Sequence, residues 1–213
     1  ARHAFAAVSE VMRAPNVLVI NPSLSATTLT EFVAHARANP GKLNYGSGGF
    51  GSALHLYSEL FNTAAKVKIT HVPFKGGGPA LVALASGEVT FGFTSMPSAM
   101  PLLNANRIRP LAVTGEKRMP ALPAVPTFDE AGVADFWIAP WYGVLVPAAT
   151  PRGVVQRLNK SINDALRSVE LRERFAALGA DAVGSTATGF GEYIGVEVAK
   201  WGKVIRAVGI KGE

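Results

Sequence analysis

The residues best placed to do chemistry lie in a glycine-rich loop. Residues 44–61 read NYGSGGFGSALHLYSELF, in which residues 46–51 have the spacing G-x-G-x-x-G. Glycines let successive backbone N–H groups point into one hollow, and the helix N-terminus that follows adds unpaired donors and partial positive charge. The loop therefore predicts an anion site. Its contact residues are predicted to be Ser47, Gly48, Gly49, Phe50, Gly51 and Ser52.

A dinucleotide is one alternative occupant of this loop. The dinucleotide fingerprint needs a strongly apolar strand before the glycines and an acidic residue about twenty positions after them. Here residues 42–45 read KLNY, a weak strand, and residues 66–70 read KVKIT. These lysines could hold a 2′-phosphate, so an NADP-dependent doubly wound enzyme stays open as an alternative. The rest of that cofactor apparatus is not apparent in the sequence.

Two further predicted strand ends carry donors and a cation. Lys75 and Gly76 follow one strand, and Thr94 and Ser95 follow the next. In a parallel sheet these loops face the same crevice as the glycine loop. His55 either donates an imidazole N–H to the same ligand or is satisfied on its helix flank. Donors, one cation and no carboxylate predict a small carboxylate or phosphate ligand.

Catalytic and metal motifs are missing from the sequence. The patterns G-x-S-x-G, H-E-x-x-H and S-x-x-K do not occur, and none of the four histidines is spaced with acids as a metal site requires. His71 has no acidic or nucleophilic neighbour in sequence. A site rich in donors and poor in general bases favours a protein that holds an anion unchanged. We therefore expect no enzyme activity, no cofactor and no metal.

Composition limits the class of protein further. The chain has 213 residues, 48% of them hydrophobic, with no cysteine and a net charge of +6. No apolar run is long enough for a membrane span, and no leader pattern opens the sequence. The chain is thus expected to be cytoplasmic or a form whose leader has been removed. Its basic residues are scattered rather than clustered with aromatics, which argues against nucleic-acid binding.

Strands and helices alternate through the first two-thirds of the chain. Thr28 and Glu31 form a predicted capping box, and the alternation itself predicts a largely parallel sheet. Two similar apolar strands, 15–21 and 141–146, are interpreted as crossovers between two lobes. The C-terminal part is predicted to be helical, with Trp201 in the core. The expected strands are 15–21, 42–47, 68–74, 89–93, 108–114 and 141–146, and the expected C-terminal helices are 152–167, 171–178 and 190–208.

Several motifs in order resemble one known family. They are YGSGGFGS at 45–52, HVPFKGGGPA at 71–80, LAVTGEKR at 111–118, LPAVPTFDEAG at 122–132, WYGVLVPAATP at 141–151 and AKWGKVIRAVGIK at 199–211. This series is similar to the extracytoplasmic solute receptors of tripartite tricarboxylate transporters, the Bug family. The likeness runs from about Pro15 to the end.

The resemblance implies an α/β fold of the type II periplasmic-binding-protein class, with two lobes and mainly parallel sheets. Lobe two would comprise residues 22–140, and residues 1–21 and 141–213 would form the rest of lobe one with the crossover strands. Receptors of this family grip a carboxylate through backbone N–H groups, hydroxyls and waters. The glycine loop with His55 would be one jaw, and Lys75, Gly76, Thr94 and Ser95 would line the wall. Periplasmic location and transporter subunits as partners are implied, and a receptor-shaped signalling module that binds a sensor protein is an alternative.

The sequence departs from the family pattern in three places. Family members begin with a further βαβ stretch that carries the other jaw; without it lobe one would be incomplete. We therefore expect weakened ligand affinity and self-association through exposed faces. Thr94, where relatives often have an acid or amide, favours plain carboxylates over amino acids. Phe74, where tyrosine is common, removes a hydroxyl from the wall.

Overall fold

The chain falls into two compact units. The computed structural model describes residues 4–134, 136, 138, 140–177, 179–207 and 209. The first unit comprises residues 1–14 and 139–203, and the second comprises residues 15–138 and 204–213. The sequence interpretation places these boundaries at residues 22 and 140 instead. Residues 16–20 belong to the second unit because they form a strand that pairs on both sides within its sheet.

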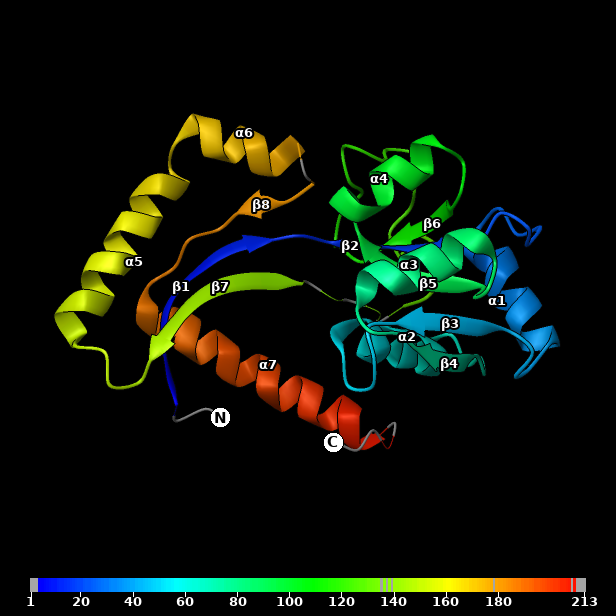
Figure 1. The fold of residues 1–213 in the computed structure, drawn as a ribbon, viewed down its shortest axis with the longest axis horizontal. Helices are drawn as coiled ribbons and strands as arrows, with labels where there is room; N and C mark the ends of the chain where they lie inside the picture. The colour runs from blue at the N-terminus through cyan, green and yellow to red at the C-terminus, as the bar shows by residue number, and fades with distance from the viewer. Residues whose placement is uncertain are drawn as a thin grey trace. The chain divides into compact units, whose positions relative to one another are not determined.

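The second unit is built on a mixed sheet (Figure 1). In the part of the chain that the structure describes, five strands lie in the order β4-β3-β5-β2-β6. Its elements are β2 (Asn16–Ile20), α1 (Leu29–Ala38), β3 (Asn44–Ser47), α2 (Ala53–Ala64), β4 (Thr70–Pro73), α3 (Gly77–Ser86), β5 (Phe91–Ser95), α4 (Met96–Asn104) and β6 (Arg109–Val113). Strand β3 pairs in parallel with β4 and β5, whereas β2 pairs antiparallel with β5 and β6. Four strands therefore share one direction, and their carboxyl ends meet at one edge.

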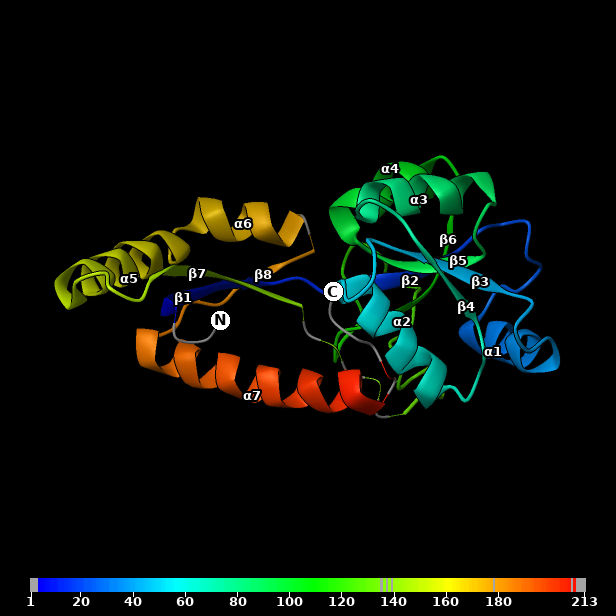
Figure 2. The same ribbon diagram turned by 60° about the horizontal axis from the view of Figure 1, so that its bottom comes forward.

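Helices cover both faces of this sheet (Figure 2). On the face of α1 and α2, the Phe91 ring lies 5.4 Å from the Phe32 ring and 5.6 Å from the Phe61 ring. On the face of α3 and α4, Val17 and Val19 belong to a second apolar cluster. The capping box predicted for α1 is confirmed by the reciprocal bonds between Thr28 and Glu31. Both faces are packed with apolar side chains, so only the ends of the strands offer polar groups.

The first unit has an antiparallel sheet. Strand β1 pairs antiparallel with both β7 and β8 within the described residues. Its elements are β1 (Phe5–Arg13), β7 (Trp141–Pro147), α5 (Arg152–Leu166), α6 (Val169–Ala177), β8 (Asp181–Ala182) and α7 (Ala187–Ala207), whose end from Val204 on is grouped with the second unit. The two sheets thus depart from the expected mainly parallel arrangement. Leu178 and Val208, the expected last residues of two helices, lie outside the described residues.

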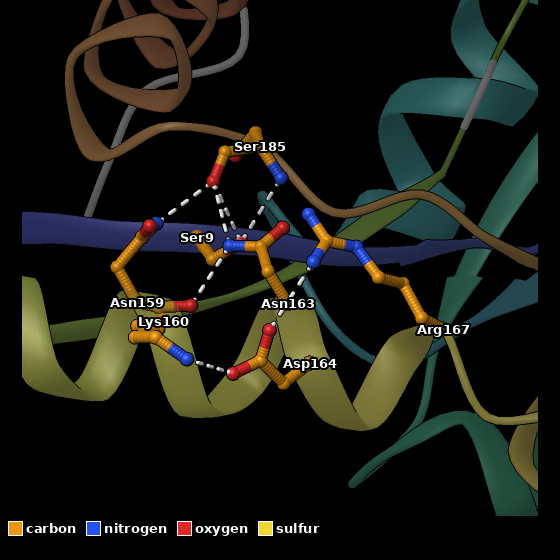
Figure 3. A network of polar contacts seen from close by, with 7 residues as sticks. All are labelled: Ser9, Asn159, Lys160, Asn163, Asp164, Arg167 and Ser185. Atoms are coloured by element: carbon orange, nitrogen blue, oxygen red, sulfur yellow. Dashed lines mark hydrogen bonds and ion pairs between the residues drawn. The ribbon is translucent and has the colours of Figure 1, made fainter.

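Strand β1 was not predicted from the sequence. It reads FAAVSEVMR, and its polar Ser9 and Glu10 are buried at register irregularities, so no apolar-polar alternation marks it. Figure 3 shows what satisfies this polar stretch: the Ser185 carbonyl accepts bonds from Ser9 Oγ at 3.2 Å, Asn159 Nδ2 at 2.7 Å and Asn163 Nδ2 at 3.0 Å. The network ties α5 to β1, because buried polar groups require partners.

Helix α7 packs against β7. A Cβ placed on Gly143 would lie 2.1 Å from the Phe190 ring, so only glycine allows this approach. Trp201, expected in the core, is half-buried, and its indole N–H donates to Glu197. Among the described residues, no helix combines the length and apolar character that crossing a bilayer requires.

Candidate ligand-binding site

Two glycine loops lie side by side at the carboxyl edge of the second unit's sheet. Strands β3 and β4 are parallel neighbours, so the loops that follow them emerge together. A Cβ placed on Gly48 would lie 3.3 Å from the carbonyl carbon of Gly76 and 3.3 Å from the nitrogen of Gly77. The backbones therefore touch without intervening side chains. We call residues 47–52 and 74–78 together the glycine-loop edge.

The first loop is held by a buried serine. The Ser47 hydroxyl is fully buried, accepts a bond from the Gly49 N–H at 3.2 Å and lies 3.1 Å from the Gly49 carbonyl. Gly49 has a φ of +113°, a region that side chains strongly disfavour. The loop ends at Ser52, whose hydroxyl caps α2 by accepting from the His55 N–H at 3.4 Å. Ser47 and Ser52 thus use their hydroxyls inside the protein.

His55 stabilises the first loop through a hydrogen bond. Its Nδ1 accepts a bond from the Gly51 N–H at 3.0 Å, and the side chain is buried. The sequence left open whether His55 contacts the ligand or is satisfied within the protein. The geometry matches the second interpretation, and the hydrogen-bond partner is the Gly51 N–H of the loop itself. Burial lowers the pKa of His55, against an opposing effect of the Glu59 carboxylate.

His71 joins the same cluster, which the sequence analysis missed. Its ring stacks on the His55 ring with centroids 3.9 Å apart, and its Nε2 lies 2.6 Å from Ser47 Oγ. The signal that could have found it is the parallel register, which pairs His71 with Tyr45 across the strands. Burial, and to a smaller extent the neighbouring His55, lower the pKa of His71 to about 4. Both rings are therefore neutral at pH 7.

Two further aromatic rings enclose this imidazole pair. Phe50, at the loop tip, is 63% exposed and meets the His71 ring edge-on at 5.0 Å. Tyr45 is buried, stacks on His71 at 5.0 Å and donates its hydroxyl to Glu59 at 2.5 Å. Burial, and then the Glu59 carboxylate, raise the pKa of Tyr45. Phe50 is thus a predicted contact residue with a largely solvent-exposed ring.

The second loop differs because no side chain caps its helix. Gly76, with a φ of +113°, is the N-cap of α3 and makes no side-chain bond. The first N–H groups of a helix have no partner within it, so those of Gly77 and Gly78 are donors at this edge. Lys75 beside them is exposed, and residues 47–52 and 74–78 contain no acidic side chain. Donors, helix dipole and cation together favour an anion.

Thr94 and Ser95 lie at the end of β5 rather than in a loop. Strand β5 extends to Ser95, two residues beyond the expected end, because it pairs with β2 up to Asn16. Thr94 is buried, and its register partner Val17 belongs to the cluster on the α3–α4 face. Ser95 is half-buried, and its hydroxyl donates to Ser98 at 3.1 Å. Thr94 is therefore not brought to the surface with the glycine-loop edge.

The cavity found in the second unit lies away from the glycine-loop edge. A cavity of about 360 Å³ is lined by Pro22, Ile108 and Arg109 among others. It lies at the opposite end of the sheet, where Ile20 pairs with Arg109. The described residues contain no group of three acidic or histidine side chains that could hold a metal ion.

Comparison with known proteins identifies the family. The family model described as "Tripartite tricarboxylate transporter family receptor" matches residues 2–210. The chain belongs to this family. It also has the fold of the periplasmic binding proteins of the family, which confirms the fold class expected from the sequence.

Individual proteins and solved structures also match over most of the chain. "Protein BugT" of Bordetella pertussis is 36% identical over 204 residues, which are 96% of this chain and 63% of BugT. The structure of R. palustris Rpa4515 with adipate matches with a TM-score of 0.91 and 38% identity, over 97% of this chain and 69% of that one. MatC from Rhodopseudomonas palustris, with bound malate, matches with a TM-score of 0.85 and 30% identity, over 94% and 69%. The chain thus spans 63% of the length of BugT.

The family of the chain bears on the two interpretations of the glycine spacing. The G-x-G-x-x-G loop belongs to a receptor family, which favours the carboxylate interpretation over the NADP interpretation. The strand before the loop has only four residues, NYGS, and its last hydroxyl is tied to His71 and Gly49.

Proposed function

We propose that this chain forms the ligand-gripping part of a periplasmic receptor that captures a small carboxylate for a tripartite tricarboxylate transporter. The observation that carries the proposal is the glycine-loop edge. There, two glycine loops touch backbone to backbone beside the uncapped start of α3. Family membership and the adipate and malate bound to two relatives support it.

The carboxylate is held by backbone donors rather than by an ion pair alone. The Gly77 and Gly78 N–H groups and the positive end of α3 face the anion, and Lys75 adds a mobile charge at the rim. Glycine at position 76 leaves room for the anion to approach the backbone. Affinity arises from these donors, and the transporter subunits are the proposed partners.

The wall of the site favours a plain dicarboxylate. Phe50 is exposed at the loop tip, and Phe74 is half-buried in the second loop. These rings suit the methylene chain of a ligand such as adipate better than a second charge. Residues 47–52 and 74–78 offer no carboxylate for an ammonium group, which supports carboxylic acids over amino acids.

The chain acts as a receptor and not as an enzyme. The groups that could serve as bases, His55 and His71, are bonded inside the protein to Gly51 and Ser47. A general base has to reach the proton that it removes. We therefore propose that the ligand leaves the site chemically unchanged.

Isothermal titration tests this function. Adipate, malate, citrate, phosphate and NADP are each titrated into the 213-residue chain at pH 7.5. We expect adipate or malate to bind, more weakly than to full-length Rpa4515, of which this chain spans 69%. Lys75→Gln should weaken binding about 3- to 10-fold, whereas Lys42→Gln, an exposed lysine before β3, should not change it. Binding of NADP without any carboxylate would contradict the proposal.

The isolated chain is also expected to self-associate. The first unit exposes apolar side chains, among them Tyr142 at 48%, Leu145 at 44% and Val169 at 70%. Burying exposed apolar side chains against a second molecule is favourable because it removes apolar surface from water. Light scattering at rising concentration should show dimers or larger species, and a constant monomer mass would contradict this expectation.

A further inference from the structure

The two stacked imidazoles lie directly beneath the backbone of the first glycine loop. His55, on α2, receives the Gly51 N–H at Nδ1, and His71, on β4, lies beside Ser47 through Nε2. Ser47 in turn bonds both polar groups of Gly49. Two of the loop's three glycines are therefore each tied to one ring, Gly51 directly and Gly49 through the Ser47 hydroxyl.

The hydrogen-bond partners determine where the ring protons lie. Nδ1 of His55 accepts a bond, so its proton is on Nε2. Nδ1 of His71 is buried without a partner among the described residues, and an unpaired buried N–H is costlier than an unpaired lone pair. The proton of His71 therefore lies on Nε2 and is donated to Ser47, whose own proton goes to the Gly49 carbonyl.

Protonation of either ring disrupts this arrangement. A proton on Nδ1 of His55 would face the Gly51 N–H, donor against donor, and break that bond. A proton on Nδ1 of His71 would be buried without an acceptor among the described residues, in a ring whose centroid lies 3.9 Å from that of His55. The titratable groups around the pair are Tyr45 on β3, which stacks on both rings, and Glu59 on α2, which is bonded to Tyr45.

We propose that the stacked His55–His71 pair positions the glycine loop for ligand binding only while both rings are neutral, so that acid releases the loop and lowers ligand affinity. This inference rests on the proposed receptor function. The lowered pKa of each ring agrees with it, because the pair stays neutral at pH 7 and charges only in acid. The two histidines are positioning residues, since they hold the first loop, whose Gly48 packs against Gly76 and Gly77 of the loop that binds the ligand.

The loop itself can be followed without any ligand. In ¹⁵N NMR spectra from pH 7.5 to pH 4.5, the amide signals of Gly49 and Gly51 should shift together with the ring nitrogens of His55. Their common midpoint should lie below pH 6.5, the usual histidine value. His35, half-buried on α1 and remote in sequence from the loop, is the reference histidine. An unchanged Gly51 amide while His55 takes up its proton would overturn the proposal.

Ligand binding supplies a second readout. Adipate affinity is measured at pH 7.5 and pH 5.0 for the wild type, for His55→Asn and for the control His35→Asn. Wild type and His35→Asn should lose at least tenfold more affinity than His55→Asn, whose Oδ1 takes the place of Nδ1 and can accept the Gly51 N–H without titrating. Parallel losses in all three would assign the effect to the ligand's own carboxyl groups and overturn the proposal.

The NMR experiment and the affinity experiment test separate claims, so one can fail without the other. If neither adipate nor malate binds at pH 7.5, the proposed carboxylate function is lost, while the amide shifts of Gly49 and Gly51 still decide the role of the pair. If His55→Asn does not fold, His71→Phe replaces it, because a phenyl ring keeps the stack and carries no proton. A Gly49 amide that titrates in His71→Phe as in the wild type would show that His71 takes no part.

Discussion

The two glycine loops of the second unit are stabilised in different ways. The first, residues 47–52, ties its backbone to side chains: Ser47 to Gly49, His55 to Gly51, and Ser52 to the start of α2. The second, residues 74–78, begins α3 at Gly76 with no side-chain cap. One loop therefore uses its donors internally, and the other leaves them for a ligand.

The two loops therefore have different roles: the first is rigid, and the second supplies the groups that bind. A preorganised loop holds its shape at no cost when the ligand arrives, whereas free N–H groups supply the attraction. Because Gly48 lies against Gly76 and Gly77, the fixed loop also sets the position of the free one. Substitutions in the first loop should thus change stability and affinity together, and substitutions such as Lys75→Gln should change affinity alone.

The largest expected loss of stability comes from the strained glycines. Gly49→Ala and Gly76→Ala each force a side chain to φ +113°, which should lower the free energy of unfolding by about 1–3 kcal/mol. Gly78→Ala, in open space within α3, is the matched control and should change it by less than about 1 kcal/mol. Urea denaturation measures all three. Equal stability of Gly49→Ala and the wild type would contradict the strain argument.

Removing the buried hydroxyl of the first loop should cost less. Ser47→Ala leaves the Gly49 N–H and His71 Nε2 without their shared partner, for a loss of about 1.5 kcal/mol. Ser58→Ala is the control, since Ser58 is equally buried but bonds only the Leu54 carbonyl of its own helix. The difference between their urea midpoints measures the contribution of the loop network. Identical midpoints would mean that the network adds no stability.

The N-cap of α2 should contribute about as much to the free energy of unfolding as the Ser47 hydroxyl, or slightly less. Ser52→Ala removes the cap of α2 and should cost about 1 kcal/mol, whereas Ser52→Gly should cost only a few tenths. Thermal unfolding followed by circular dichroism distinguishes the two. If alanine and glycine prove equally tolerated, the 3.4 Å bond to the His55 N–H does not stabilise the helix.

His71→Phe is expected to change the free energy of unfolding least at pH 7, but a difference from the wild type should appear in acid. The unfolded imidazole binds a proton near pH 6.5, and folded His71 binds one only near pH 4. Between these values the unfolded state holds more protons, so wild-type stability falls as pH drops through this window. His71→Phe should lose less stability over that range in urea titrations. A steeper loss in the variant would reverse the assigned sign.

Local sequence patterns predicted the second unit well. The capping box at Thr28 and Glu31 and the strand-loop-helix order around residues 44–61 depend on neighbours close in sequence, and both are present. Strand β1 could not be predicted, because its buried Ser9 is satisfied by Ser185, 176 residues away. The end of β5 was misplaced for the same reason: its last residues are held by pairing with β2.

For the candidate site, the sequence by itself determined which backbone could bind an anion. Glycines at 48, 49, 51 and 76 and the absence of acids around them are facts of composition and spacing. Only the tertiary structure decided how the loop is held. His55 and His71 are 16 positions apart, and their ring centroids come within 3.9 Å because β4 places His71 beside β3, while α2, which follows β3, carries His55. Strand register is a non-local property, so the imidazole pair could not be inferred from residue order.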